Sequence, residues 1–266
     1  LRATTGSTGS QSTAAYNAIA SYNYFLDSHY NNLLGAQLKG MRNETLKWQQ
    51  KMEYNFGLDF NYKNRYALSF EYYIQTTNNT VNPIDLVPST GFSTVQENIG
   101  KVENKGFDAS ISAIAWQRPS DRSYLRFSLM MSHNKNTLKE ISGAMKSYNE
   151  QQTALATSTN KPLSKYYDGV SMDAIWAVPS LGIDPATGKE IYLVTDENGN
   201  QYRTFNYDGN KQVVCGDALP KINGNAGISF EYKGLGFNAV CTYKWGGKMY
   251  NTTLVNKVEN ADLNNN

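Results

Sequence analysis

Apolar and polar residues alternate along much of the chain, and the clearest alternation covers residues 52–60. Even positions there include Met52, Phe56 and Phe60, while the odd positions hold Glu, Asn, Gly and Asp. A period of two is typical of a β-strand with one apolar and one polar face. Similar alternation predicts seven strands, one near Leu1 and the others at 47–61, 65–76, 105–117, 123–136, 221–232 and 235–246.

The connections between these predicted strands alternate in length. The short turns lie at 62–64, 118–122 and 233–235, and the long connections at 7–46, 77–104 and 137–220. Outer-membrane barrels have short periplasmic turns and longer extracellular loops, and their strands turn apolar residues to lipid and polar residues to the lumen. The sequence therefore predicts an all-β fold: an antiparallel transmembrane β-barrel segment with long extracellular loops, the longest at 138–220.

Composition excludes two other classes of protein. The longest apolar run covers residues 174–178, whereas a transmembrane helix needs about 20 apolar residues. The net charge is only +2 and no basic run is present, which argues against a nucleic-acid binder. A mean hydropathy of -0.56 still allows a barrel, because a spanning strand needs only about ten alternating residues.

Catalytic and metal-binding chemistry has little support. Neither His29 nor His133 has a nucleophile or carboxylate at motif spacing, so we expect no enzyme, cofactor or metal site. The segment 184–188 lacks the acidic positions of a calcium loop and is interpreted as a turn. Cys215 and Cys241 are predicted to be free thiols, because the last hairpin separates them by about 40 Å of extended chain.

Two sets of residues are candidates for function. Aromatic residues of the longest loop could stack on sugar rings or pack against a partner protein, or they could form the loop's own small core. The candidates are Tyr166, Tyr167, Trp176 and Tyr192. The polar faces of the strands would line the lumen. The lumen-facing candidates are Asp59, Glu71, Asp108, Arg126 and Glu231.

Several stretches resemble the SusC/RagA family of TonB-dependent outer-membrane transporters of Bacteroidetes. The opening LRATTGSTGSQ is similar to a family strand-end segment, and NFGLDF at 55–60 matches the family's N-x-G-L-D-F. The most specific stretches are PSTGF at 88–92 and NIGKVENKGF at 98–107. Weaker matches lie at 43–49, 184–189 and 216–221; in the first, Glu44 replaces the usual Pro and Gln49 the usual Glu.

The resemblance implies that residues 1–266 are about seven strands from the C-terminal half of a roughly 22-stranded barrel in the outer membrane. The plug, the TonB box and the final strands of such a barrel would lie outside this sequence. The family imports glycans or oligopeptides, with a SusD-like lipoprotein at the extracellular face and TonB as energy source. The alternatives are a secreted carbohydrate-binding or adhesive β-sandwich and an outer-membrane enzyme at a barrel rim.

Overall fold

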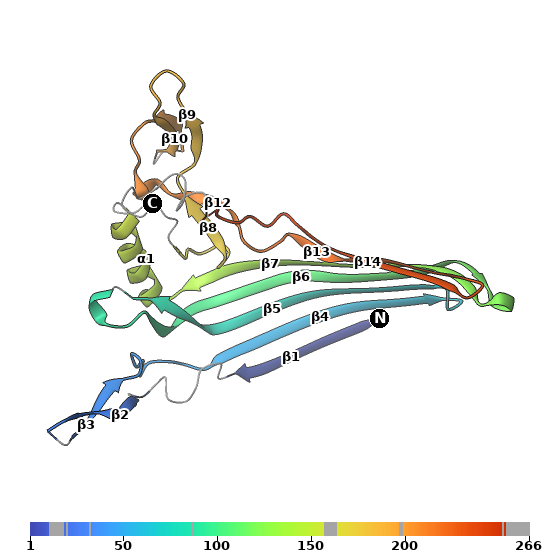
Figure 1. Cartoon of the computed structure of the whole chain (residues 1–266), viewed down its shortest axis with the longest axis horizontal. Coiled ribbons are helices and arrows are strands. Elements are labelled where there is room, and N and C mark those ends of the chain that lie inside the picture. The colour runs from blue at the N-terminus through green and yellow to red at the C-terminus, as the bar shows by residue number, and fades with distance from the viewer. Residues whose placement is uncertain are drawn as a thin grey trace. The chain divides into compact units, whose positions relative to one another are not determined.

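The computed structural model describes residues 1–10, 19, 21–31, 33–86, 88–156, 164–196, 199–251 and 253. Seven long strands form one sheet in the order β1-β4-β5-β6-β7-β13-β14 (Figure 1). Their bounds are β1 (Arg2–Ser10), β4 (Gln49–Tyr62), β5 (Tyr66–Asp85), β6 (Thr94–Arg118), β7 (Ser123–Ile141), β13 (Ile222–Tyr232) and β14 (Leu235–Trp245). The predicted seven-stranded antiparallel sheet is confirmed.

Shorter elements occupy the connections. The first connection holds the paired strands β2 (Tyr22–Tyr30) and β3 (Leu33–Leu38). The connection between β7 and β13 holds α1 (Gly143–Ala156), β8 (Ala174–Ala177), β9 (Ser180–Ile183), β10 (Glu190–Thr195), β11 (Gln201–Thr204), the 3-10 turn η4 (Gly209–Lys211) and β12 (Val213–Asp217). These strands form a three-stranded sheet, β11-β10-β9, and the pair β12-β8. None of the helices in the described part of the chain is long and apolar enough to cross a membrane.

The chain divides into two compact units. The first comprises residues 1–110, 134–147 and 166–170, and the second comprises 111–133, 148–165 and 171–266. Strands β6 and β7 contribute residues to both units. Each unit is therefore described by itself below.

In the first unit, the register between β4 and β5 places apolar residues opposite apolar residues. Phe56 lies opposite Tyr72, Leu58 opposite Phe70, and Phe60 opposite Leu68. Residues directly opposite one another in an antiparallel pair share a face, so one face carries the large apolar side chains and the other the polar ones. We call these the aromatic face and the polar face.

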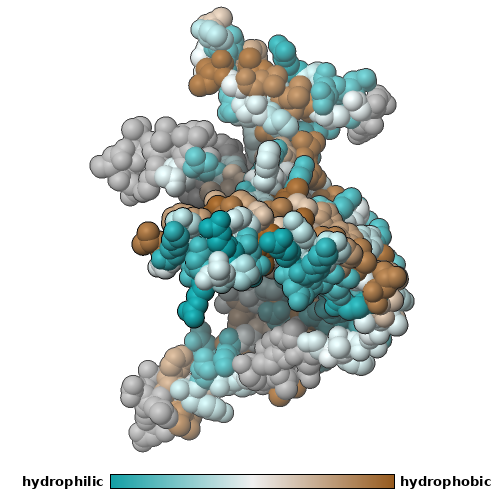
Figure 2. Space-filling view, turned by 90° about the vertical axis from the view of Figure 1, so that its right-hand side faces the viewer, coloured by the Kyte–Doolittle hydropathy of each residue, from teal (hydrophilic) through white to brown (hydrophobic). Residues whose placement is uncertain are grey.

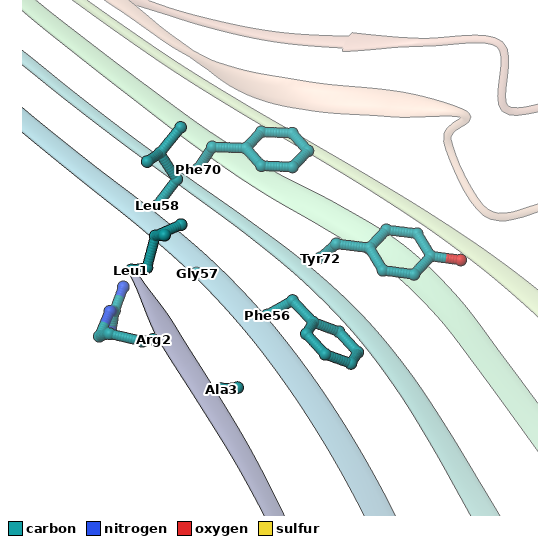
Figure 3. Close-up of a pocket in the computed structure, with 8 residues that line it drawn as sticks. All are labelled: Leu1, Arg2, Ala3, Phe56, Gly57, Leu58, Phe70 and Tyr72. Carbon is teal, nitrogen blue, oxygen red and sulfur yellow. The ribbon is translucent and has the colours of Figure 1, made fainter.

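Side chains of the aromatic face are exposed rather than covered. Phe56 and Phe60 are each 55% exposed, and Phe70 stacks on Phe107 of β6 at a centroid distance of 5.9 Å. Figure 3 shows Phe56, Phe70 and Tyr72 projecting on one side of the sheet, beside a shallow hollow of about 410 Å³ that Leu1 and Ala3 also line. An exposed face of this kind suits contact with lipid rather than the interior of a β-sandwich.

The second unit has the same two-faced register. Phe230 lies opposite Leu125 of β7 and opposite Phe237 of β14, and Ile228 lies opposite Phe127. The short turns fall where the sequence predicts them. Lys233 and Gly234, with φ of 47° and 90°, connect β13 to β14, and the 3-10 turn η3 (Pro119–Asp121) connects β6 to β7.

The prediction of a long connection at 77–104 is wrong. Strand β5 continues to Asp85 and β6 begins at Thr94, so the connection between them is short. Side chain–backbone bonds hold these strand ends. The Asn98 amide donates to the carbonyl oxygens of Lys47 and Asn79, each at 2.9 Å, and the Lys47 N–H donates to Asn98 Oδ1 at 2.7 Å.

A small apolar core lies where β5, β6, β7 and the start of α1 contribute to the first unit. Its buried side chains are Ile84, Ile99, Val102, Leu138 and Met145. Gly100 sits within it at a φ of +123°, and a Cβ at that position would clash with the carbonyl oxygen of Glu140. Close approach of β6 to β7 therefore requires glycine at this position.

Candidate functional site

The polar face of the first unit carries a carboxylate held by three neighbours. Glu53 pairs with the Lys51 ammonium at 2.9 Å and accepts a hydrogen bond from the Asn55 amide at 2.8 Å. The Gln75 amide, opposite Glu53 on β5, donates to it at 3.4 Å. Asn55 Oδ1 is buried and accepts no bond from the described residues, so this amide keeps an acceptor on the polar face.

A second group on this face joins side chains from three strands. The Tyr73 hydroxyl donates to Asn134 Oδ1 at 3.3 Å, and the amides of Asn134 and Asn136 donate to Asn104 Oδ1 at 3.3 and 2.9 Å. We call Tyr73, Asn104, Asn134 and Asn136 the amide cluster. Uncharged amides both donate and accept hydrogen bonds, which suits contact with peptide groups or sugar hydroxyls.

All five predicted lumen-facing residues lie on the polar face. Asp59 lies opposite Ser69, and Glu71 opposite Gly57. Asp108 follows Phe107, whose ring stacks on the aromatic face, so alternation turns Asp108 to the opposite face.

In the second unit, Arg126 lies opposite Ser229 and Glu231 opposite Tyr124. Asp59 is the most engaged of the five candidates, since it pairs with Arg2 at 2.8 Å and accepts a hydrogen bond from the Ser69 hydroxyl at 2.8 Å. That these residues line a transport path remains a prediction.

The four aromatic candidates of the long connection lie on different elements. Tyr166 and Tyr167 belong to the first unit, and Tyr167 is 40% exposed. Trp176 on β8 lies opposite Val214 of β12 in the second unit. On β10, the Tyr192 ring meets the Tyr207 ring edge-on at 5.5 Å, and its hydroxyl donates to Glu190 at 2.7 Å.

Sequence reasoning missed the amide cluster and the role of Asn98. The available signal was weak: Asn104, Asn134 and Asn136 occupy polar-face positions, but asparagine is common throughout this chain. The structure also leaves apolar side chains exposed on the three-stranded sheet and just beyond it. These are Leu181, Ile183, Tyr202 and Phe205, exposed by 48%, 70%, 49% and 49%.

Three ionisable groups of the long connection have shifted pKa values. Burial lowers the pKa of Lys165, which is only 5% exposed. Burial, together with the nearby Asp217 carboxylate, raises the pKa of Asp173. The Thr187 hydroxyl and the Ala186 N–H both donate to Asp184 and lower its pKa; these bonds belong to the predicted turn.

Metal and thiol chemistry find no organised site in the described part of the chain. No cluster of three or more His, Cys, Asp or Glu side chains suits a metal ion there. Cys215 and Cys241 carry free thiols, and the Cys215 thiol donates to the carbonyl oxygen of Ala177 at 3.5 Å. The side chain of His29 lies outside the described residues, as do residues 197 and 198 of a predicted loop tip.

The chain is similar in sequence to known TonB-dependent receptors. No family model matches the chain. The chain is 24% identical to TonB-dependent receptor P39 of Formosa agariphila over 288 residues, which cover 94% of the chain and 27% of that receptor. It is 27% identical to TonB-dependent receptor P3 of the same organism, over 96% of the chain and 26% of the receptor. Identity to TonB-dependent receptor SusC of Bacteroides thetaiotaomicron is 26%, over 59% of the chain and 16% of SusC.

The fold is that of a solved transporter. The structure of the RagAB peptide transporter superposes with a TM-score of 0.73 at 22% identity, over 92% of this chain and 26% of the matched chain. The open-open state of the RagAB peptide importer superposes with a TM-score of 0.67. Over most of its length the chain is therefore similar to TonB-dependent receptors, and its fold is similar to that of the RagAB transporter. It spans about a quarter of the length of the curated receptors P39 and P3, at 27% and 26%.

The SusC/RagA-like stretch 98–107 has a structural explanation. Asn98 bonds the backbone before β4 and within β5, and Gly100 allows β6 to approach the backbone of β7. Asn104 accepts from two asparagine amides of β7. The stretch therefore couples β6 to the chain on both of its sides.

Proposed function

We propose that the full-length protein is an outer-membrane, TonB-dependent importer of glycans or oligopeptides that works with a SusD-like lipoprotein. The observation that most supports this proposal is the seven-stranded sheet, which has an exposed aromatic face and a hydrogen-bonded polar face. Similarity to TonB-dependent receptors supports energy coupling through TonB. Similarity to SusC and to the RagAB transporter supports the lipoprotein partner.

The two faces would divide the work of transport. The aromatic face would contact lipid, because burying its large side chains against acyl chains is favourable. The polar face would line the path, with Asp59, Glu71, Asp108, Arg126 and Glu231 setting its charge. Within that path, the amide cluster is suited to transient hydrogen bonds with an uncharged polar substrate, because its amides both donate and accept.

The long connection would supply the contacts outside the membrane. Exposed Tyr167 could stack on a sugar ring or cover a peptide side chain, and Trp176 and Tyr192 are proposed to contribute on β8 and β10. Leu181 and Ile183 on β9 are exposed by 48% and 70%. Apolar exposure of this size suits a protein partner, and we assign it to the lipoprotein.

Uptake by a deletion strain tests the activity and the substrate class. The strain and its complemented parent receive fluorescent oligopeptides or fluorescent oligosaccharides of similar size, with and without a protonophore. We expect one class to enter only the complemented cells and only when energised. Equal uptake in both strains, or uptake that survives the protonophore, would contradict the proposal.

Variants then separate the path from the loop. Replacing Asn104 and Asn134 together with alanine should slow import while leaving surface capture intact. Replacing Tyr167 and Trp176 together should weaken capture. Asn61→Ala, on the polar face near a short turn, is the matched control and should leave both steps unchanged. Normal capture and import in both double variants would remove these residues from the site.

A further inference from the structure

The short turns of the sheet carry an excess of positive charge. In the first unit the turn after β4 contains Lys63 and Arg65 without an acidic residue. In the second unit, Arg118 is the last residue of β6, and the turns after β6 and β13 contain Arg122 and Lys233. Figure 2 shows hydrophilic and hydrophobic residues side by side on the face that it presents.

Both lysines of these turns have a backbone conformation in which other residue types are usually found. Lys63 has a φ of 52° and Lys233 a φ of 47°, in the left-handed region where glycine and asparagine are preferred. Each lysine follows a tyrosine and folds over its ring, with Nζ 5.2 Å from the Tyr62 centroid and 5.4 Å from the Tyr232 centroid. A Tyr-Lys turn of this kind is thus found in each unit.

In the second unit, the start of β7 contacts the turn after β13. The Lys233 N–H donates to the hydroxyl of buried Ser123 at 3.2 Å. Arg118 has a nearby carboxylate in Asp121, at 3.7 Å. Among the described residues no acidic side chain pairs with Arg122 or Lys233, so the positive charge there is only partly neutralised.

Aromatic rings lie directly beside these cations. The Tyr232 ring stacks on Phe230 at 6.4 Å and meets Trp116 at 6.3 Å. Tyrosine and tryptophan prefer the boundary between the hydrocarbon and the headgroups of a bilayer. A cation placed just beyond such rings lies at the depth of lipid phosphates.

We propose that the Tyr-Lys turns, Tyr62-Lys63 in the first unit and Tyr232-Lys233 with Arg122 in the second, bind the phosphate groups of anionic phospholipids in the inner leaflet of the membrane. The inference rests on the proposed outer-membrane location, with the short turns on the periplasmic side. This role would explain why lysine occupies a left-handed position. Asparagine would fit the turn better, but it has no positive charge to pair with a phosphate.

Lipid binding to the full-length protein in a neutral detergent tests the proposal. The probes are a short-chain phosphatidylglycerol, a phosphatidylcholine with the same chains, and inorganic phosphate. We expect wild-type protein to bind phosphatidylglycerol in preference to phosphatidylcholine, and each lysine-to-asparagine change to weaken that binding about fivefold, from the surface attraction of one basic residue to anionic lipid. Lys63→Asn and Lys233→Asn preserve the turns, because asparagine tolerates positive φ.

Lys189→Asn, in the long connection, is the control with the same change in charge and should bind phosphatidylglycerol as wild type does. Equal binding of both lipids, equal loss in the control, or full competition by inorganic phosphate at the lipid's concentration would overturn the proposal. Because binding is measured on purified protein, its failure is separate from failure of the proposed function, which the uptake experiment reports. Both turn variants should still import substrate.

Discussion

Asn98 connects three parts of the chain, and its replacement should loosen them together. Its amide donates to the carbonyl oxygens of Lys47 and Asn79, and its Oδ1 accepts from the Lys47 N–H, at 2.9, 2.9 and 2.7 Å. A hydrogen bond contributes about 0.5–1.5 kcal/mol to stability. The bonds to Lys47 are solvent-exposed, so water can replace them in part, and we expect Asn98→Ala to cost about 1–3 kcal/mol.

Two measurements on the full-length protein check this value. Denaturant unfolding in lipid vesicles gives the loss in free energy, and hydrogen exchange of the peptide containing Lys47 gives the local effect. Asn98→Ala should speed exchange at the Lys47 amide. Asn98→Asp retains the acceptor but loses both donated bonds, so that amide should stay protected while stability falls.

The control is Asn61→Ala, because Asn61 is an exposed residue of β4 whose side chain makes no hydrogen bond to another described residue; it should change stability by no more than about 0.5 kcal/mol. Unchanged exchange at Lys47 in Asn98→Ala would refute the assigned role of this side chain. Equal acceleration in Asn98→Asp would show that the acceptor contributes nothing.

Three further predictions concern the faces, the strand crossing and pH. Phe56→Arg should cost about 2–4 kcal/mol, because it places charge on the aromatic face, which we propose contacts lipid; heat-modifiability gels should lose the folded band, whereas Asn55→Arg, beside a carboxylate on the polar face, should assemble. Gly100→Ala should cost about 2–6 kcal/mol from strain and overpacking, measured by urea unfolding, whereas Gly143→Ala has open space and should be neutral. The Asp184 pKa lies below its ordinary value of 3.8, so its contribution to turn stability is complete above that pH and disappears as the pH falls through the lowered pKa; amide protection of residues 184–189 should follow this loss, and Asp184→Asn should abolish the dependence.

The strands that carry the aromatic face could be predicted because a sheet with one apolar and one polar face imposes a period of two. Phe56, Leu58 and Phe60 lie on the same face of β4, and each has an apolar or aromatic residue of β5 directly opposite it. A shift of one residue would turn every one of these side chains to the polar face. Strand bounds, short turns and facing therefore follow from the sequence over β4, β13 and β14.

The extensions of β5, β6 and β7 could not be predicted by the same reasoning. Residues 77–85 are rich in Asn and Thr, and Asn79 has a positive φ of 52°, which is typical of a turn. These strand ends carry no aromatic side chains, so the alternation disappears although the strands continue. Bonds from Asn98 stabilise the extension, and a bond between residues distant in sequence leaves no periodic signal.

Helix α1 is not predicted by the sequence pattern, for a related reason. Its buried face combines Met145 and Tyr148 with Asn149 and Gln152, all less than 9% exposed. A buried face that is half polar gives little hydrophobic periodicity. The helix is stabilised by tertiary contacts, which a search for apolar stripes does not detect.

Aromatic residues that bind a ligand and aromatic residues that form a core are of the same residue types, so the sequence does not distinguish them. Their burial in the structure does. Tyr148 is 5% exposed, and Tyr192 packs against Tyr207, so replacing either would disturb the connection itself as well as any ligand. Tyr167, Tyr202 and Phe205 are 40%, 49% and 49% exposed. Truncating an exposed ring removes little packing. A change in uptake on replacing these exposed residues would therefore report binding, whereas a change at Tyr192 would also report folding of the loop.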